Sequence, residues 1–242
     1  MTFVSVTPVT LRVARLDGTE LTIVNADRLA DLFFTLDRSS RGDDSYDAMT
    51  SRTSPNRIER VDVDAINGPM RARSKPEVWQ DLYDVQHLPW LAALDPGWDL
   101  MCDDARWDAD RIPEAISGAL LGVIAPYRNV SVATKMLHLK RPALFPVLDR
   151  LVVESVNGHI SSTASPVTRA SQALVVTEHL RREIRKHQEE LVEIQGRLHA
   201  IGVDRTTTRI MDGLLWMTHP DSELAPLGSV VARWRADDIP SP

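Results

Sequence analysis

The stretch that decides the fold reads VSVATKMLHLKRPALFPVLDRLV, from Val130 to Val152. Its first half predicts a helix that starts at Ser131 and stops before Pro142, because the residue before a proline disfavours helical backbone. Its last residues predict a second, short helix that begins after Asp149, since aspartate is a preferred N-cap residue. The stretch therefore indicates two helices joined by an irregular connection.

The same stretch carries a local excess of positive charge. Its cations are Lys135, Lys140, Arg141 and Arg150, and its one acid is Asp149. The whole chain has 28 Lys and Arg against 34 Asp and Glu, a net charge of −6, which argues against coating nucleic acid through an overall positive field. We expect Lys140 and Arg141 to form an exposed basic surface with Lys135 or Arg150. The alternative is a solvated helix end whose cations only complement the helix dipole.

Residues 130–152 resemble a stretch of the helix-hairpin-helix DNA glycosylase superfamily. In that superfamily a hairpin that contacts the DNA backbone leads into a helix, and then into a "P…fPvD" element with an essential aspartate. The stretch is also similar to the pattern SKLLxxKRPxLxPVxD of uncharacterised actinobacterial proteins, which look like degenerate relatives of the superfamily. The resemblance implies that Asp149 lies where the essential aspartate sits. It places Lys135 near the lysine that some members use as a nucleophile.

Base-excision chemistry explains why these two residues would matter. A carboxylate stabilises the sugar cation or activates water, and a lysine forms a Schiff base at the sugar. The resemblance therefore implies a nucleic-acid-binding protein, with DNA favoured over RNA, with Asp149 and Lys135 as catalytic candidates and no cofactor. Whether it catalyses a reaction stays open. Lys140, Arg141, Arg150 and His138 are candidate phosphate ligands. Asp149 as a plain helix cap and His138 as a buried, hydrogen-bonded histidine remain the alternatives.

A second candidate phosphate site reads MRARSKPE, from Met70 to Glu77. Ser74 and Glu77 have the spacing of a capping box, which predicts a helix start behind Arg71 and Arg73. A helix start favours anions, and arginine binds phosphate through two parallel hydrogen bonds. The alternative is that these arginines pair with the acidic segment 95–114.

The rest of the chain predicts a mainly α-helical protein with an N-terminal β-hairpin. The hairpin spans 9–16 and 19–24 around the turn Asp17-Gly18, which favours a type I′ turn and sets Arg15 opposite Glu20. Asn25 is then expected to cap a helix. The expected parts are the hairpin and helix (1–36), a flexible loop (37–57), a helical domain with a helix-hairpin-helix-like element (58–219) and a tail (220–242).

The longest predicted helix runs without a break from about Pro166 to Ala200. Its apolar seam follows heptad spacing: Leu180, Ile184, His187, Leu191, Ile194, Leu198 and Ile201. Packing in a bundle within one chain and a homodimeric coiled coil both fit this seam. The second alternative predicts a non-enzymatic helical interaction protein.

Other classes of site have little support in the sequence. Cys102 is the only cysteine, so no internal disulfide exists and nothing places a histidine beside it. The acidic segment 95–114 matches no metal-binding loop, and no nucleotide-binding fingerprint occurs. We expect neither a membrane helix nor a signal peptide, and hence a cytoplasmic protein.

Overall fold

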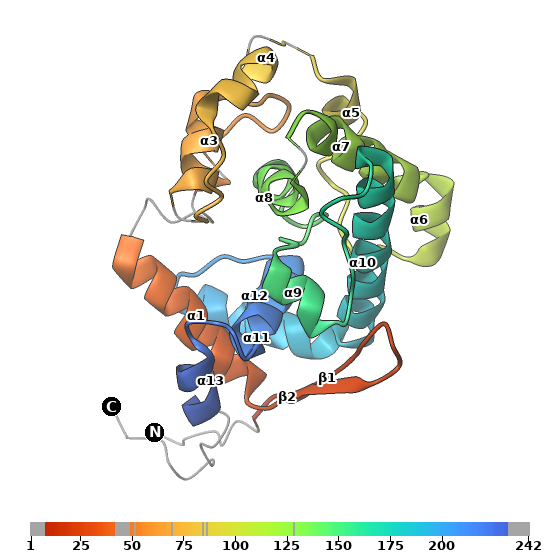
Figure 1. Ribbon diagram of the computed structural model, residues 1–242. Coiled ribbons are helices and arrows are strands. Elements are labelled where there is room, and N and C mark those ends of the chain that lie inside the picture. The colour runs from red at the N-terminus through yellow and green to blue at the C-terminus, as the bar shows by residue number, and fades with distance from the viewer. Residues whose placement is uncertain are drawn as a thin grey trace.

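The structure is a computed structural model that describes residues 8–41, 49–50, 52–68, 70–83, 85, 87–127 and 129–231. It is mainly helical with an N-terminal two-stranded hairpin, so the predicted fold class is confirmed (Figure 1). No helix in these ranges is both long enough and apolar enough to cross a bilayer.

The hairpin pairs β1 (Leu11–Ala14) with β2 (Glu20–Ile23) in antiparallel register. Ala14 lies opposite Glu20, so five residues connect the strands. The predicted two-residue turn, with Arg15 opposite Glu20, is therefore wrong.

The five-residue connection is stabilised by hydrogen bonds within the turn and by another to a distant part of the chain. Asp17 Oδ1 accepts from the backbone nitrogen of Thr19 at 3.0 Å and from its hydroxyl at 2.7 Å. The backbone nitrogen of Leu16 donates to the carbonyl of Val156 at 2.9 Å. The Leu16 bond ties the hairpin tip to the end of a helix distant in the sequence, and local turn statistics do not reflect such a contact.

The helices follow in chain order. They are α1 (Ala26–Arg41), α3 (Arg60–Asn67), the 3₁₀ turn η2 (Pro76–Trp79), α4 (Gln80–Tyr83), α5 (Pro89–Ala92), α6 (Asp104–Ala109), α7 (Ile112–Tyr127), α8 (Val130–Lys140), α9 (Arg150–Ser155), α10 (Pro166–Lys186), α11 (Gln188–Ala200), α12 (Thr207–Thr218) and α13 (Ala225–Val231). The predicted helices before Pro142 and after Asp149 are confirmed as α8 and α9.

Helix α8 lies at the centre of the fold. It packs against α3, α7 and α10, and Figure 1 shows it nearly end-on among them. Every residue of α8 is buried except Ser131, which is half-buried. A helix buried on all sides carries its polar residues into the core, where they need partners.

The predicted continuous helix from 166 to 200 is wrong. The chain leaves helical geometry at His187, which ends α10 and begins α11 with φ −107° and ψ 27°. His187 Nε2 lies 2.9 Å from the carbonyl oxygen of Arg12 in β1, and Lys186 Nζ donates to the same oxygen at 2.6 Å. The hairpin therefore binds the chain where the helix breaks.

The heptad seam packs within the chain. Five of its apolar members, on both sides of the break, are fully buried, namely Leu180, Ile184, Leu191, Ile194 and Leu198, whereas the last member, Ile201, is exposed. Helix α11 packs on α1 and α12, and α10 packs on α7. The five buried side chains are consequently not available to a second copy of the chain.

Three smaller predictions have mixed outcomes. Helix α1 continues to Arg41, so the expected loop begins later than residue 37, and residues 42–48 lie outside the described ranges. Asn25 precedes α1 with φ +54°, and its side-chain amide donates to the carbonyl of Val231 at 2.8 Å. Helices α7 and α8 follow one another closely, but nothing identifies this pair as a helix-hairpin-helix element, which stays a prediction.

Candidate functional site

The cations at the end of α8 lie in the core rather than on the surface. Lys140 Nζ lies 2.5 Å from Asp62 Oδ2 of α3 and donates to the carbonyl of Ser54 at 2.9 Å. Burial lowers the pKa of Lys140 and raises that of Asp62, because desolvation opposes both charges. This pair joins α3 to α8.

Arg141 acts as a buried connector. Its Nε and Nη2 donate to the carbonyl of Leu94 at 2.9 and 2.7 Å, and its Nη1 donates to that of Pro55 at 2.6 Å. A further Nη2 contact of 2.9 Å reaches Asn56 Oδ1. Arg141 is 2% exposed and Lys140 is 4% exposed, so the expected basic surface is wrong for both residues.

Lys135 is also buried, and it does not share a hollow with Asp149. Its Nζ donates to the carbonyl of Met70 at 2.9 Å, and burial lowers its pKa, while the Asp149 carboxylate acts in the opposite direction. The two residues are therefore electrostatic neighbours. The Lys135 ammonium thus joins α8 to the 70–75 segment.

Asp149 caps α9 and also lines a hollow. Its Oδ1 accepts from the backbone nitrogen of Val152 at 3.1 Å, which confirms the N-cap reading. The hollow of about 430 Å³ that it lines, the Asp149 hollow, is bounded by Asn129, Val130, Ser131, Leu148, Asp149, Arg150, Val153, Glu154, Gly158, His159, Ile160, Ser161, Ser162 and Arg169. The cap uses one carboxylate oxygen and leaves the residue only half-buried.

Several helix starts border the Asp149 hollow. Asn129 is the N-cap of α8, Asp149 is the N-cap of α9, and Arg169 belongs to the first turn of α10. The first amides of a helix lack partners within it and carry a partial positive charge. Residues from both ends of the stretch 130–152, which resembles the glycosylases, therefore line the same hollow.

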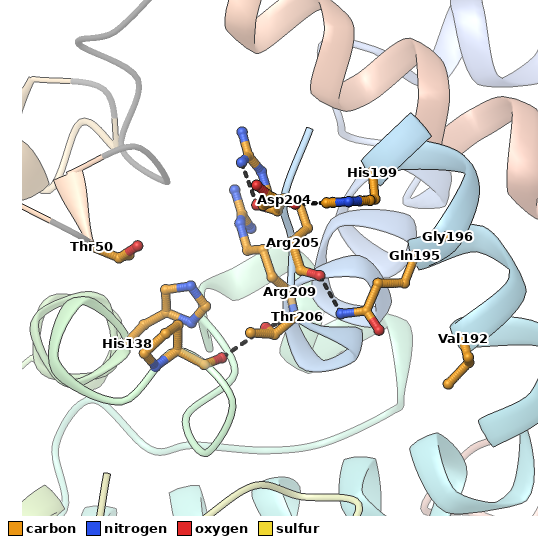
Figure 2. Close-up of a pocket in the computed structure, with 11 residues that line it drawn as sticks. Thr50, His138, Val192, Gln195, Gly196, His199, Asp204, Arg205, Thr206 and Arg209 are labelled. Atoms are coloured by element: carbon orange, nitrogen blue, oxygen red, sulfur yellow. Dashed lines mark hydrogen bonds and ion pairs between the residues drawn. The ribbon is translucent and has the colours of Figure 1, made fainter. Parts of the chain in front are cut away.

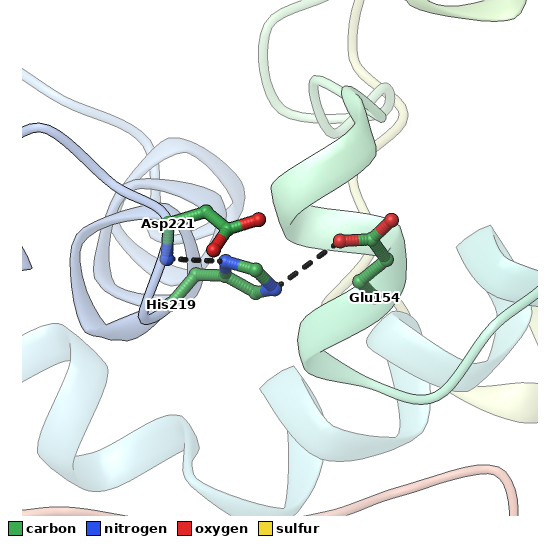
Figure 3. A group of neighbouring side chains, drawn as sticks. All are labelled: Glu154, His219 and Asp221. Carbon is green, nitrogen blue, oxygen red and sulfur yellow. Dashed lines mark hydrogen bonds and ion pairs between the residues drawn. The ribbon is translucent and has the colours of Figure 1, made fainter.

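Arg150 lines the Asp149 hollow and pairs with two carboxylates. Its Nη1 lies 2.9 Å from Glu154 Oε2 and 3.0 Å from Asp221 Oδ2. Glu154 and Asp221 also lie near His219, and these three residues could hold a metal ion (Figure 3).

The hydrogen bonds around His219 oppose metal binding at this cluster. The backbone nitrogen of Asp221 donates to Nδ1, so the ring proton of the neutral imidazole lies on Nε2, 3.3 Å from Glu154 Oε2. A metal at Nε2 needs the proton on Nδ1, where the amide already points. A metal ion would also have to displace Arg150 from both carboxylates.

The 70–75 segment differs from its prediction. Ser74 binds Asn67 rather than Glu77: its backbone nitrogen and its hydroxyl donate to Asn67 Oδ1 at 2.7 and 2.8 Å. The following turn, η2, has Lys75 as its N-cap without a side-chain bond. The predicted capping box is therefore wrong.

Arg71, Arg73 and Lys75 nevertheless lie exposed on this segment. Arg71 and Arg73 both adopt left-handed backbone, with φ of +48° and +52°. Arg71 Nη1 lies 3.4 Å from Glu223 Oε2, so the segment reaches towards the loop that carries Asp221. Arg71 therefore pairs with Glu223 and not with the acidic segment 95–114, which was the alternative.

The acidic segment binds arginines of its own. Asp104 pairs with Arg181 and Arg185 of α10, and these hydrogen bonds lower the pKa of its carboxyl, with Arg185 the larger cause. Asp103 caps α6 by accepting from the backbone nitrogen of Arg106. Burial raises the pKa of the Cys102 thiol, which disfavours the reactive thiolate.

Sequence reasoning missed a second hollow, the arginine cleft, of about 540 Å³ (Figure 2). Its lining comprises Thr50, His138, Pro142, Val192, Gln195, Gly196, His199, Asp204, Arg205, Thr206 and Arg209. His138 is 1% exposed, and its Nδ1 lies 2.7 Å from the carbonyl oxygen of Phe145, in line with the buried-histidine alternative. No sequence motif joins these residues, because they come from separate helices and loops.

The sequence profile of one family, described as a family of unknown function (DUF6308), matches residues 26–219. The chain belongs to the DUF6308 family. No curated protein and no solved structure matches the chain. The DUF6308 region includes the Asp149 hollow and the arginine cleft, but not Asp221 or Glu223.

Proposed function

We propose that the protein binds the phosphate backbone of nucleic acid at the Asp149 hollow and along the neighbouring segment from Arg71 to Lys75. The observation that carries this proposal is the meeting of Asn129, Ser131 and Asp149 at one hollow. These residues lie at the two ends of the stretch that resembles the glycosylases. Helix starts at such a place favour a phosphate oxygen.

In this proposal the exposed cations of the segment from Arg71 to Lys75 attract the phosphates of the nucleic acid. Two contacts connect it to the surroundings of the hollow: Lys135 Nζ to the Met70 carbonyl at 2.9 Å, and Arg71 Nη1 to Glu223 Oε2 at 3.4 Å. An exposed arginine can leave a weak surface ion pair and bind a phosphate instead, because such a pair contributes little free energy.

Any base excision at this site would be hydrolytic. A water molecule would replace the base on the sugar, while the Asp149 carboxylate stabilises the positive charge that develops there. A lysine Schiff base is not part of the proposal, because Lys135 is 7% exposed and donates to a backbone carbonyl.

The binding test is a titration of labelled single-stranded and duplex DNA at several salt concentrations. Each phosphate contact contributes a slope of about −0.9 to a plot of log affinity against log salt for duplex DNA. A site of this size therefore predicts a slope of roughly −1 to −3, well below that of a broad basic surface. The variant Arg71→Gln/Arg73→Gln should weaken binding and reduce the slope.

A matched control removes two arginines elsewhere. Arg106 and Arg111 are exposed and pair with Asp110 and Glu114. Arg106 belongs to α6 and Arg111 lies between α6 and α7, and Figure 1 shows α6 on the opposite side of the molecule from α3. Arg111 also has left-handed backbone, with φ +54°. Arg106→Gln/Arg111→Gln should leave DNA affinity unchanged, and equal losses in both double variants would reject a localised site.

The catalytic part is tested by release of free base from duplexes that carry damaged or mismatched bases. Asp149→Asn keeps a good N-cap, so the fold and DNA affinity should survive while base release is lost. If the unaltered protein releases no base from a broad panel, only the binding proposal stands. If it also fails to bind at low salt, the proposal is rejected in favour of a helical interaction protein.

A further inference from the structure

The arginine cleft lies at the opposite end of α8 from the Asp149 hollow. His138 and Pro142 line the cleft, whereas Val130 and Ser131 line the hollow, and the two sites share no lining residue. Its volume of about 540 Å³ lies within the usual range for small-molecule sites. The cleft can therefore bind a ligand independently of the proposed nucleic-acid site.

Aromatic rings of α1 hold two guanidinium groups at the cleft. The guanidinium carbon of Arg205 lies 5.3 Å from the ring centroid of Phe34. That of Arg209 lies 5.5 Å from the centroid of Phe33 and 5.7 Å from that of Phe34. Arg209 also pairs with the buried carboxylate of Asp212. Contact with a ring face orients a cation without removing its charge.

Hydrogen bonds fix the backbone that carries Arg205. Gln195 Nε2 of α11 donates to the carbonyl of Arg205 at 2.6 Å. The hydroxyl of Thr206 donates to the carbonyl of Pro142 at 2.9 Å, and Figure 2 shows both bonds beside the two arginines. A site whose donors are already in place loses little conformational entropy when a ligand binds.

The charge of the cleft favours an anion. Among the described residues that line it, two are arginines, two are histidines and one, Asp204, is an acid. The Asp204 carboxylate lies 2.5 Å from His199 Nδ1 at the exposed edge of the cleft. Asp212, the partner of Arg209, lies outside the lining, so Asp204 is the one acid among the lining residues that the structure describes.

Gly196 lines the cleft at a position where no close packing contact requires a glycine. It lies within α11, where glycine is less favourable than alanine, and a Cβ at this position would meet no heavy atom within 4 Å. Because Gly196 lines the cleft, a larger side chain there would extend into the cleft. The glycine therefore keeps open a wall that also includes the apolar side chain of Val192.

From these observations we propose that the arginine cleft binds a small organic phosphate monoester. A phosphate monoester carries nearly two negative charges at neutral pH, so the half-buried Arg205 guanidinium attracts it more strongly than it attracts a single carboxylate. The apolar surfaces of Val192 and Pro142, with the open wall at Gly196, suit the organic part.

The experiment is isothermal titration of the full chain with phenyl phosphate, inorganic phosphate and benzoate. We expect phenyl phosphate to bind at least tenfold more tightly than inorganic phosphate, which lacks the organic part, or benzoate, which lacks the second charge. Arg205→Gln should weaken phenyl phosphate binding by about tenfold or more, since a charge-assisted hydrogen bond is lost.

Two variants of Gly196 give a test that changes no charge. Gly196→Trp should abolish phenyl phosphate binding by filling the cleft, whereas Gly196→Ala should retain it, and both should keep the wild-type circular dichroism spectrum. Undetectable binding of phenyl phosphate to the unaltered chain, undiminished binding to a folded Gly196→Trp variant, or equal affinity for benzoate would each overturn the proposal. DNA affinity should be the same in all three proteins.

Discussion

Two basic stretches that look alike in the sequence have opposite environments in the structure. Arg71, Arg73 and Lys75 are exposed on an irregular segment. Lys135, Lys140 and Arg141 also lie within a short stretch, yet each is buried and hydrogen-bonded to a backbone carbonyl. Charge density along a chain therefore does not determine whether the charges reach solvent.

The residues between the cations account for the difference. In α8 the intervening positions include Met136, Leu137 and Leu139, which cover several faces of the helix and place it in the core. Around Arg71 and Arg73 the apolar neighbours are only Met70 and Ala72, and both are partly rather than fully buried. The cations of α8 consequently join helices, while those of the 70–75 segment remain available to a ligand.

The largest expected effect concerns the buried pair of Lys140 and Asp62. Lys140→Met should lower the free energy of unfolding by about 3–5 kcal/mol, because it leaves the Asp62 carboxylate buried without its cation. Urea unfolding followed by circular dichroism measures the loss. The matched exposed change, Arg73→Met, should alter stability by less than about 0.5 kcal/mol.

A double variant distinguishes an unpaired charge from lost packing. Asp62→Asn/Lys140→Met removes both charges and keeps an acceptor for the Glu59 backbone nitrogen, which Asp62 now binds. It should be more stable than Lys140→Met alone. If the double variant is the less stable of the two, desolvation of the pair is not the cause.

The next effect concerns the shape of a cation rather than its charge. Arg141→Lys should lower the free energy of unfolding by about 2 kcal/mol. A lysine ammonium cannot bind the carbonyls of Leu94 and Pro55 and the side chain of Asn56 at once, as the planar guanidinium group does. Thermal unfolding of this variant beside Arg73→Lys measures the difference. Equal midpoints in the two variants would show that Arg141 does not connect these segments.

A smaller effect should depend on pH. Burial lowers the pKa of Lys135 in the folded chain below its ordinary value, so the folded state binds fewer protons than the unfolded state between these two values. The penalty is complete below the folded pKa and disappears as pH rises from that value through 10.5. Relative to Lys135→Met, the unaltered chain should therefore gain stability as pH is raised. Parallel stability curves for both proteins between pH 7 and 10.5 would contradict this shift.

The sequence predicted those helices whose signals are local. Asp149 caps α9 as expected, and α10 begins at the predicted Pro166, because an N-cap requires only one side chain and the next few amides. The break at His187 could not be predicted in this way. It coincides with contacts to Arg12, which lies more than 170 residues away in the chain.

The candidate site was predictable only in part. The resemblance selected Asp149, and this residue does line a hollow. The sequence could not show that Lys135 binds the Met70 carbonyl, or that Arg205 and Arg209 lie beside the rings of α1, since these contacts depend on how distant helices pack. The seven-residue spacing of the apolar seam likewise fits burial in one chain and in a dimer equally well.

The smallest expected effect on stability sharpens the original comparison. Arg71→Gln/Arg73→Gln should change the free energy of unfolding by less than about 0.5 kcal/mol, because both side chains are exposed and the Arg71–Glu223 pair spans 3.4 Å at the surface. The left-handed backbone of both residues is retained, since glutamine and arginine have similar costs there. Unfolding by urea and DNA titration on the same preparation then report stability and binding separately. A large loss of stability would place this segment with α8 as a structural connector, whereas a loss of DNA affinity at unchanged stability is the result expected of exposed residues that bind phosphate.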